Sequence, residues 1–276
     1  MFVFIWKPIS ASRLPTALIC CFLSWFGCTM AFDLFGFSVI QASLLGNLAG
    51  ILSVLLCCMF WNQCVFVDSW EVPLLFGLYS AIAVLVWIGC QGLFGYLYHK
   101  IGSEGWDLYV STQQEFSVSE LLFFTLIAAP LLEELFVRHL CYGMVVQRFP
   151  ALDLVLLVGT SALFGAMHGN VVQGFSGFFA GLIFCMAYRQ GGIILSLWCH
   201  VLFNFCSVFF PVVYADACKE LESGSLGLFY FYGSAVICLL WLYLVGPNFG
   251  IAKQCEANLR FQMADVVDDL RELEEE

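Results

Sequence analysis

Three ionisable residues lie within one long apolar stretch of this sequence. Glu133, Glu134 and Arg138 all fall between Leu121 and Val146, where most of the surrounding residues are hydrophobic. A charged side chain at the centre of a bilayer costs about 2.5 to 3.5 kcal/mol on insertion scales, and such residues usually face a partner or a water-filled cavity. Three of them within six residues therefore indicate a site, in which a carboxylate could transfer protons.

The spacing of these residues separates two roles. Glu134 precedes Arg138 by four residues, so the two side chains lie on one helix face in the order that favours an ion pair. Glu133 is rotated by about 100° from Glu134, so Arg138 cannot pair equally with both. We therefore expect the Glu134 side chain to be held in an ion pair with Arg138 and the Glu133 side chain to be less constrained. Pro130 lacks a backbone donor and can loosen the helix near Ala128, or it can form a packing kink.

Two further apolar segments carry polar residues at the same spacing. Phe164 and His168 are four residues apart, as are His200 and Asn204, so each pair shares one helix face. A histidine can gain or lose a proton near neutral pH, and a neutral histidine beside an asparagine can donate hydrogen bonds to a developing oxyanion. Together, the three segments supply a base, a residue that orients it and an oxyanion site.

These motifs resemble those of a known family, the CPBP intramembrane proteases, which includes the type II CAAX prenyl endopeptidases and bacteriocin-processing or self-immunity (Abi-like) relatives. The EExxxR motif of the family is similar to EELFVR at 133–138, its FxxxH motif to the segment from Phe164 to His168, and its HxxxN motif to that from His200 to Asn204. The three motifs occur in the family's order within about Leu121–Phe210, and each lies in an apolar span.

The resemblance implies peptide hydrolysis without a metal, a cofactor or a covalent intermediate. In such enzymes the residues that match Glu133 and His168 activate a water molecule, which attacks the scissile carbonyl. The residues that match His200 and Asn204 stabilise the oxyanion. Three more motif residues have supporting roles, the first two by holding the catalytic glutamate and its helix: Glu134, Arg138 and Phe164.

The composition is that of an all-α, polytopic transmembrane helix bundle. Of the 276 residues, 62% are hydrophobic and only 11% are charged, and the mean hydropathy is +0.91. The net charge of −11 does not indicate a cationic partner, because the last 26 residues alone contribute −5. The 14 cysteines lie mostly in apolar runs and form no CxxC pair, so they are typical of small buried side chains rather than of a disulfide scaffold.

The apolar runs divide into eight candidate spans of about 20 residues. They are Leu14–Phe32, Phe37–Trp61, Val72–Tyr98, Val118–Val146, Leu152–His168, Val171–Tyr188, Gly192–Val213 and Leu226–Val245. We assign 1–116 to an N-terminal region of three spans with a polar loop at His99–Phe116, 117–213 to the catalytic helix core, 214–250 to the last span and 251–276 to an acidic cytoplasmic tail. Counting residues from the ends of their spans places His168 and His200 at different depths in the membrane. We therefore expect the Leu152–Tyr188 hairpin to be short and to lie deep in the membrane.

Basic residues predict the orientation, because they concentrate on the cytoplasmic side of membrane proteins. With the N-terminus inside, seven basic residues are cytoplasmic: Lys7, Arg13, Arg148, Arg189, Lys253, Arg260 and Arg271. Two are outside: Lys100 and Lys219. We therefore expect both termini in the cytoplasm. We also expect an uncleaved signal anchor as the first span and a bacterial inner membrane as the location.

Three other functions remain open from the sequence. A zinc protease could use Glu133, His168 and His200 as its three ligands, although no HExxH motif occurs. A membrane scaffold or immunity-type protein could bind partner helices without catalysis. A transporter could relay protons through the same residues, but the sequence has no internal repeat. As partners we expect a peptide or membrane-protein substrate and the lipid bilayer, and no nucleic acid; the substrate's identity and the oligomeric state are not indicated.

Overall fold

The described part of the chain is almost entirely helical. The computed structural model describes residues 14–60, 73–101, 104–114 and 116–213, and four positions between 229 and 236. No β-strand occurs among these residues, in agreement with the predicted all-α class. The predicted last span at Leu226–Val245 and the acidic tail lie outside the described residues, apart from those four positions.

The helices coincide with the other seven predicted spans. In chain order the structure contains α1 (Leu14–Leu34), α2 (Val39–Phe60), α3 (Pro73–Ile101), α4 (Glu104–Gln113), α5 (Val118–Phe123), η1 (Phe124–Ala128), α6 (Ala129–Glu133), η2 (Glu134–Gly143), α7 (Met144–Arg148), η3 (Pro150–Leu152), α8 (Asp153–Ala166) and α9 (Val171–Val213). Within the described residues, two segments are long and apolar enough to cross a membrane, Phe76–Tyr98 in α3 and Val171–Phe210 in α9. The total of eight spans stays a prediction.

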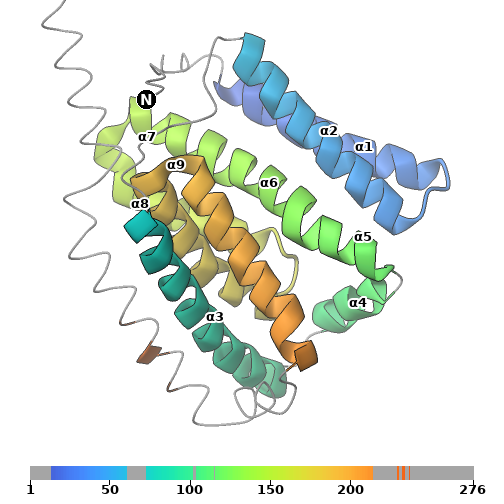
Figure 1. Cartoon of the computed structure of the whole chain (residues 1–276). Helices are drawn as coiled ribbons and strands as arrows, with labels where there is room; N and C mark the ends of the chain where they lie inside the picture. The colour runs from blue at the N-terminus through green and yellow to red at the C-terminus, as the bar shows by residue number, and fades with distance from the viewer. Residues whose placement is uncertain are drawn as a thin grey trace, which may run out of the picture.

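The helix α9 reverses direction at Gly192. This glycine has φ 68° and ψ −164°, a backbone conformation that residues with a side chain rarely adopt. Phe184 and His200, on either side of the reversal, stack with ring centroids 4.6 Å apart. A continuous helix would separate residues sixteen positions apart by about 24 Å. Therefore α9 consists of two antiparallel arms, 171–191 and 193–213, which match the sixth and seventh predicted spans (Figure 1).

The helix that carries the EExxxR motif is central in the bundle. The elements α5, η1, α6, η2 and α7 form one continuous helix, drawn in green in Figure 1, which lies between the α1–α2 pair and the group formed by α3, α8 and α9. It begins with a capping box, in which Ser117 accepts a bond from the Glu120 amide and the Glu120 carboxylate accepts one from the Ser117 amide. It ends just before Pro150. Two of its stretches, η1 and η2, are π-helical, a form that often occurs at functional sites.

The polar stretch after α3 is not merely a loop, as the sequence predicted, because it contains the helix α4. The ring of Trp106 in α4 packs against Phe94 of α3 with centroids 4.7 Å apart. The hydroxyl of Tyr98 donates a 2.9 Å hydrogen bond to Asp107. These contacts hold the short helix against α3. Such packing depends on the tertiary structure and could not be predicted from the composition of this short polar stretch.

Close glycine contacts hold α8 against the first arm of α9. A side chain at Gly177 would place its first carbon 3.2 Å from the Cα of Gly165 and 3.1 Å from Nδ1 of His168. A side chain at Gly177 would therefore require the Gly165 backbone or the His168 ring to shift by a few tenths of an ångström. This packing agrees with the expectation that the α8 hairpin is short and tightly packed.

Candidate active site

The carboxylate of Glu134 is completely buried and bound by three side chains. Its Oε1 lies 3.1 Å from Nη1 of Arg138 and 2.8 Å from Nδ1 of His200. Its Oε2 accepts a short hydrogen bond from the hydroxyl of Ser196. Glu134 is 0% exposed and Arg138 is 1% exposed, so the predicted ion pair between them is present and lies away from solvent. With both oxygens engaged, Glu134 is suited to hold other residues rather than to exchange protons.

Two aromatic rings enclose the guanidinium of Arg138. Its central carbon lies 4.1 Å from the ring centre of Phe164 and 5.1 Å from that of Phe184. The negative face of an aromatic ring attracts a cation, most strongly where water is excluded. Arg138 meets Glu134 as an ion pair without an aligned hydrogen bond, so the rings contribute much of its solvation. This contact accounts for the phenylalanine of the FxxxH motif.

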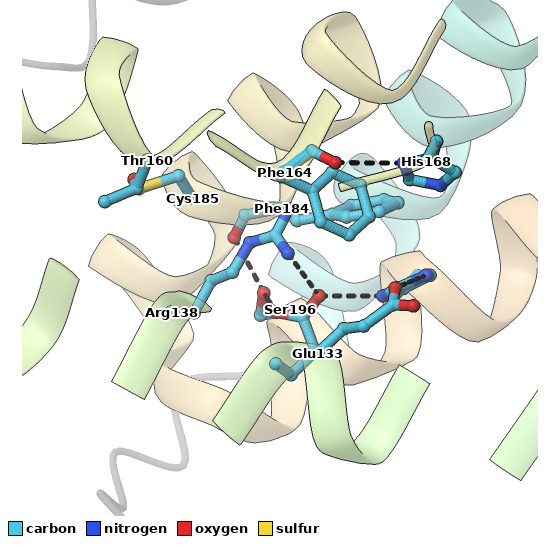
Figure 2. Close-up of polar contacts among 10 residues, drawn as sticks. Glu133, Arg138, Thr160, Phe164, His168, Phe184, Cys185 and Ser196 are labelled. Atoms are coloured by element: carbon cyan, nitrogen blue, oxygen red, sulfur yellow. Dashed lines mark hydrogen bonds and ion pairs between the residues drawn. The ribbon is translucent and has the colours of Figure 1, made fainter. Parts of the chain in front are cut away.

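The imidazole of His200 lies between the two glutamates. Its Nδ1 is 2.8 Å from Glu134, and its Nε2 is 3.5 Å from Oε2 of Glu133. The ring also stacks on Phe184, with an angle of 19° between the two planes. Figure 2 shows this chain of contacts running from Arg138 through the buried carboxylate to Glu133. His200 therefore connects the buried ion pair to Glu133, the more exposed glutamate, and helps to hold it in place.

The Glu133 side chain is the accessible carboxylate of the pair. It is 25% exposed, whereas His200 beside it is 3% exposed. The expectation that one glutamate is tied and the other freer agrees with this difference in burial. Glu133 is therefore the glutamate of the two that a water molecule can contact.

His168 is oriented by the backbone of its own motif. Its Nδ1 lies 2.9 Å from the carbonyl oxygen of Phe164, which can only accept, so Nδ1 carries the hydrogen that it donates; in the neutral ring Nε2 is then an acceptor. No hydrogen bond or ion pair joins His168 to Glu133 in the part of the chain that the structure describes. A ligand between the two would be needed to connect them.

The Phe164 ring contacts both histidines of the motifs. Its centroid lies 5.1 Å from that of His168 and 5.5 Å from that of His200. The two imidazoles therefore lie close together. The separation expected from counting residues is not observed, because α8 is only 14 residues long and packs closely against α9.

Asn204 contributes from the second arm of α9. It lies one helical turn after His200, and its Nδ2 donates a 2.9 Å hydrogen bond to the carbonyl oxygen of Thr125. An asparagine amide has two hydrogens, so one remains for another acceptor. The structure thus brings the motif residues from three helices around one place.

Ser196 and Phe184 are the two site residues that the motifs did not indicate. Ser196 precedes His200 by four residues and so shares its helix face, which is a signal that the sequence contained. Phe184 carried no such signal, because a phenylalanine in an apolar run looks like any core residue. Its position between Arg138 and His200 depends on the reversal at Gly192.

The ligand set of the zinc alternative is not assembled in the described structure. Among the residues that the structure describes, no group of three His, Cys, Asp or Glu side chains is arranged to hold a metal. Both nitrogens of His200 face carboxylates. His139, which matched no motif, is buried away from the cluster and contacts the hydroxyl of Tyr188 at 3.1 Å.

A surface cavity of about 520 Å³ lies between α8 and the first arm of α9. It is lined by Ala162, Gly165, Ala166, Gly169, Asn170, Val171, Gly174, Phe175 and Phe178. None of the four candidate catalytic side chains lines it, so it is separate from the contacts around His200.

The comparison with known families agrees with this arrangement. Residues 116–206 match the family model of the type II CAAX prenyl endopeptidases described as Rce1-like. No curated protein and no solved structure matches the chain. The matched residues include all three motifs and every side chain of the cluster around Glu134. The match supports the family that the motifs indicated: the segment that carries this site is similar to the type II CAAX prenyl endopeptidases among the CPBP intramembrane proteases.

Proposed function

We propose that this protein is an intramembrane endopeptidase in which Glu133 and His168 activate a water molecule. The observation that supports this most is the pairing of an accessible glutamate with a buried one through a single histidine. The buried ion pair fixes His200, His200 fixes Glu133, and Glu133 remains open to water. Proteins that use a buried ion pair only to hold helices together have no need of a second, accessible carboxylate beside it.

In this proposal Glu133 is the general base. A water molecule between Glu133 and His168 gives one proton to the carboxylate while its oxygen attacks the scissile carbonyl carbon. His168 accepts a hydrogen bond from the same water at Nε2, because its Nδ1 is already bonded to Phe164. Glu133 then returns the proton to the leaving amine nitrogen as the carbon–nitrogen bond breaks.

We assign one oxyanion donor to His200. Its Nδ1 faces Glu134, so only Nε2–H, which lies beside Glu133, can also donate to a developing oxyanion. The second amide hydrogen of Asn204 is the other donor that we assign to the oxyanion.

We infer the membrane orientation from the positions of the basic residues along the bundle. Arg189, near the end of the first arm of α9, pairs with Asp153 at 2.6 Å, and Arg148 lies five residues before Asp153. Lys100 lies at the opposite end, close to where α4 meets the start of that arm at Asn170. The arm between these ends is about 27 Å long, close to the hydrocarbon thickness of a bilayer. We infer that the end with Arg148 and Arg189 faces the cytoplasm.

We infer a substrate that is already tethered to the membrane, cleaved near its end. The family's type II CAAX prenyl endopeptidases suggest a prenylated C-terminal peptide as the first candidate. Bacteriocin-like peptides and other membrane proteins are the next candidates. A prenylated fluorogenic peptide is therefore the first probe for activity.

The test in cells compares membrane proteins from cells with the native protein and cells with Glu133→Gln. We expect mass spectrometry to detect a shortened protein or a released peptide only with the native residue. An unchanged set of termini, together with an unchanged cellular phenotype, would instead favour a scaffold or immunity-type protein that binds partner helices without cleaving them.

A further inference from the structure

Ser196 differs from Ser161, the other buried serine among the described residues, in what its hydroxyl contacts. A serine inside a helix commonly bonds to the carbonyl four residues earlier, as Ser161 does with Leu157 at 2.7 Å. For Ser196 that carbonyl would belong to Gly192, where the helix is broken. Its hydroxyl instead reaches Glu134 in another helix and the Phe184 carbonyl in the first arm of α9, at 2.8 Å.

This hydroxyl connects three helical segments at one point. Ser196 belongs to the second arm of α9, Phe184 to the first arm and Glu134 to the central helix. It is 0% exposed, so water does not replace it. Because a hydroxyl has one hydrogen, the charged Glu134 is its stronger acceptor, and the Phe184 carbonyl remains within reach.

The two oxygens of Glu134 are thereby held from two sides. Oε1 contacts Nδ1 of His200 and the guanidinium of Arg138, and Oε2 accepts the hydrogen bond from Ser196. A carboxylate held at only one oxygen can rotate about its last side-chain bond, and Nδ1 of His200 would move with it. The Nε2 atom, on the far side of the imidazole, lies beside Glu133 at 3.5 Å and would be displaced as well.

We propose that Ser196 is a positioning residue that fixes Glu134 and, through Glu134 and His200, sets the place of the Glu133 base. Ser196 does not touch the reacting atoms. This inference rests on the proposed function only for its effect on rate; its effect on His200 does not depend on any activity.

The kinetic test uses the full-length protein in detergent and a fluorogenic farnesylated peptide with a C-terminal CAAX box. We expect Ser196→Ala to lower kcat about 10- to 100-fold with little change in KM, because it removes one hydrogen bond to a charged group. Ser196→Cys, which keeps the size but is a weak donor, should lose as much. Ser196→Thr, which keeps the hydroxyl, should recover most of the rate. Ser161→Ala is the matched control, since it removes a buried serine hydroxyl that bonds only within its own helix.

The second readout is the nitrogen NMR spectrum of ¹⁵N-histidine-labelled protein. The chain has four histidines, so single substitutions assign the His200 signals. We expect Ser196→Ala to shift the His200 Nδ1 signal and Ser161→Ala to leave it unchanged. If Ser196→Ala changes neither the rate nor the His200 signals, the proposal is wrong. If the native protein does not cleave the peptide, the proposed activity toward it fails, and the His200 spectrum alone decides the role of Ser196.

Discussion

The side-chain amide of Asn204 bonds to the backbone carbonyl of Thr125 at 2.9 Å, across two helices. Thr125 lies in the π-helical stretch η1, where the Ala129 amide bonds to the Phe124 carbonyl five residues earlier. The next donor in this pattern would be residue 130, which is a proline and has no N–H. Asn204 therefore satisfies an acceptor that Pro130 leaves without its helical donor.

The first prediction concerns this compensation. Asn204→Ala should destabilise the native protein by about 1 kcal/mol, the lower end of the usual cost of an unsatisfied polar group, because this bond is only partly buried. In a Pro130→Ala background the new backbone N–H can bond to Thr125, so the same change should cost clearly less. Thermal unfolding of the four proteins in detergent measures the difference. Asn47→Ala is the control, because Asn47 bonds to the carbonyl four residues earlier in its own helix. Equal costs of Asn204→Ala in both backgrounds would contradict the compensation.

Arg138 should matter more for folding than for chemistry. Arg138→Ala leaves the buried Glu134 without its cationic partner, and breaking a buried pair typically costs about 3 to 5 kcal/mol. The double change Glu134→Gln with Arg138→Gln removes both charges and should restore much of the lost expression. Arg148→Gln, at an exposed position, serves as the control. If the double variant accumulates no better than Arg138→Ala, the two side chains do not act as a pair.

Reporter fusions should place the two ends of the bundle on opposite sides of the membrane. We expect a cytoplasmic signal from a fusion after Arg148 and an external signal from one after Lys100, because basic residues favour the cytoplasm. A fusion after Glu276 should agree with the one after Arg148. Signals from the same side for Arg148 and Lys100 would overturn the predicted topology.

Removal of metal ions should leave cleavage unchanged. His200 directs both nitrogens toward carboxylates, and His168 uses one nitrogen on its own helix. A zinc ion bound by Glu133, His168 and His200 would have to displace a contact between His200 and one of the two carboxylates. The measurement is the cleavage rate after incubation with a strong chelator, with and without added zinc. Loss of activity that zinc restores would favour the zinc protease.

The positions of the helices were predictable because they follow from local properties of the sequence. Seven apolar runs became helices at nearly the predicted bounds. The ion pair between Glu134 and Arg138 was predictable for the same reason, since a separation of four residues places both on one face of any helix. The π-helical geometry of η2 did not prevent this contact.

Contacts between helices were not predictable, because they depend on packing that no single segment encodes. The sequence associated His200 with the oxyanion, whereas the structure places it between two carboxylates. It also gave no reason to connect Asn204 with Thr125, or Ser196 with Phe184, which lie on different helical segments. The reversal at Gly192 determines most of these contacts, and a glycine pair in an apolar run does not specify its angle.

Glu133 and His168 should behave as one unit. Each is proposed to contact the same water, so Glu133→Gln and His168→Ala should each abolish cleavage, and the double change should be hardly worse than either. His200→Ala and Asn204→Ala should leave slower but measurable turnover, since one oxyanion donor contributes about 10²- to 10³-fold. Strictly multiplicative losses for Glu133 and His168 would indicate two independent roles.

The most direct measurement is the rate at which purified Glu133→Gln cleaves the prenylated fluorogenic peptide, compared with the native protein and with Glu120→Gln. Glu120 is an exposed glutamate in the same helix, in the capping box with Ser117, so its substitution controls for the change in residue type. We predict that Glu133→Gln inserts normally and has no detectable activity, while Glu120→Gln cleaves at nearly the native rate. Full activity of Glu133→Gln beside an active native protein would contradict the proposal that this glutamate is the catalytic base.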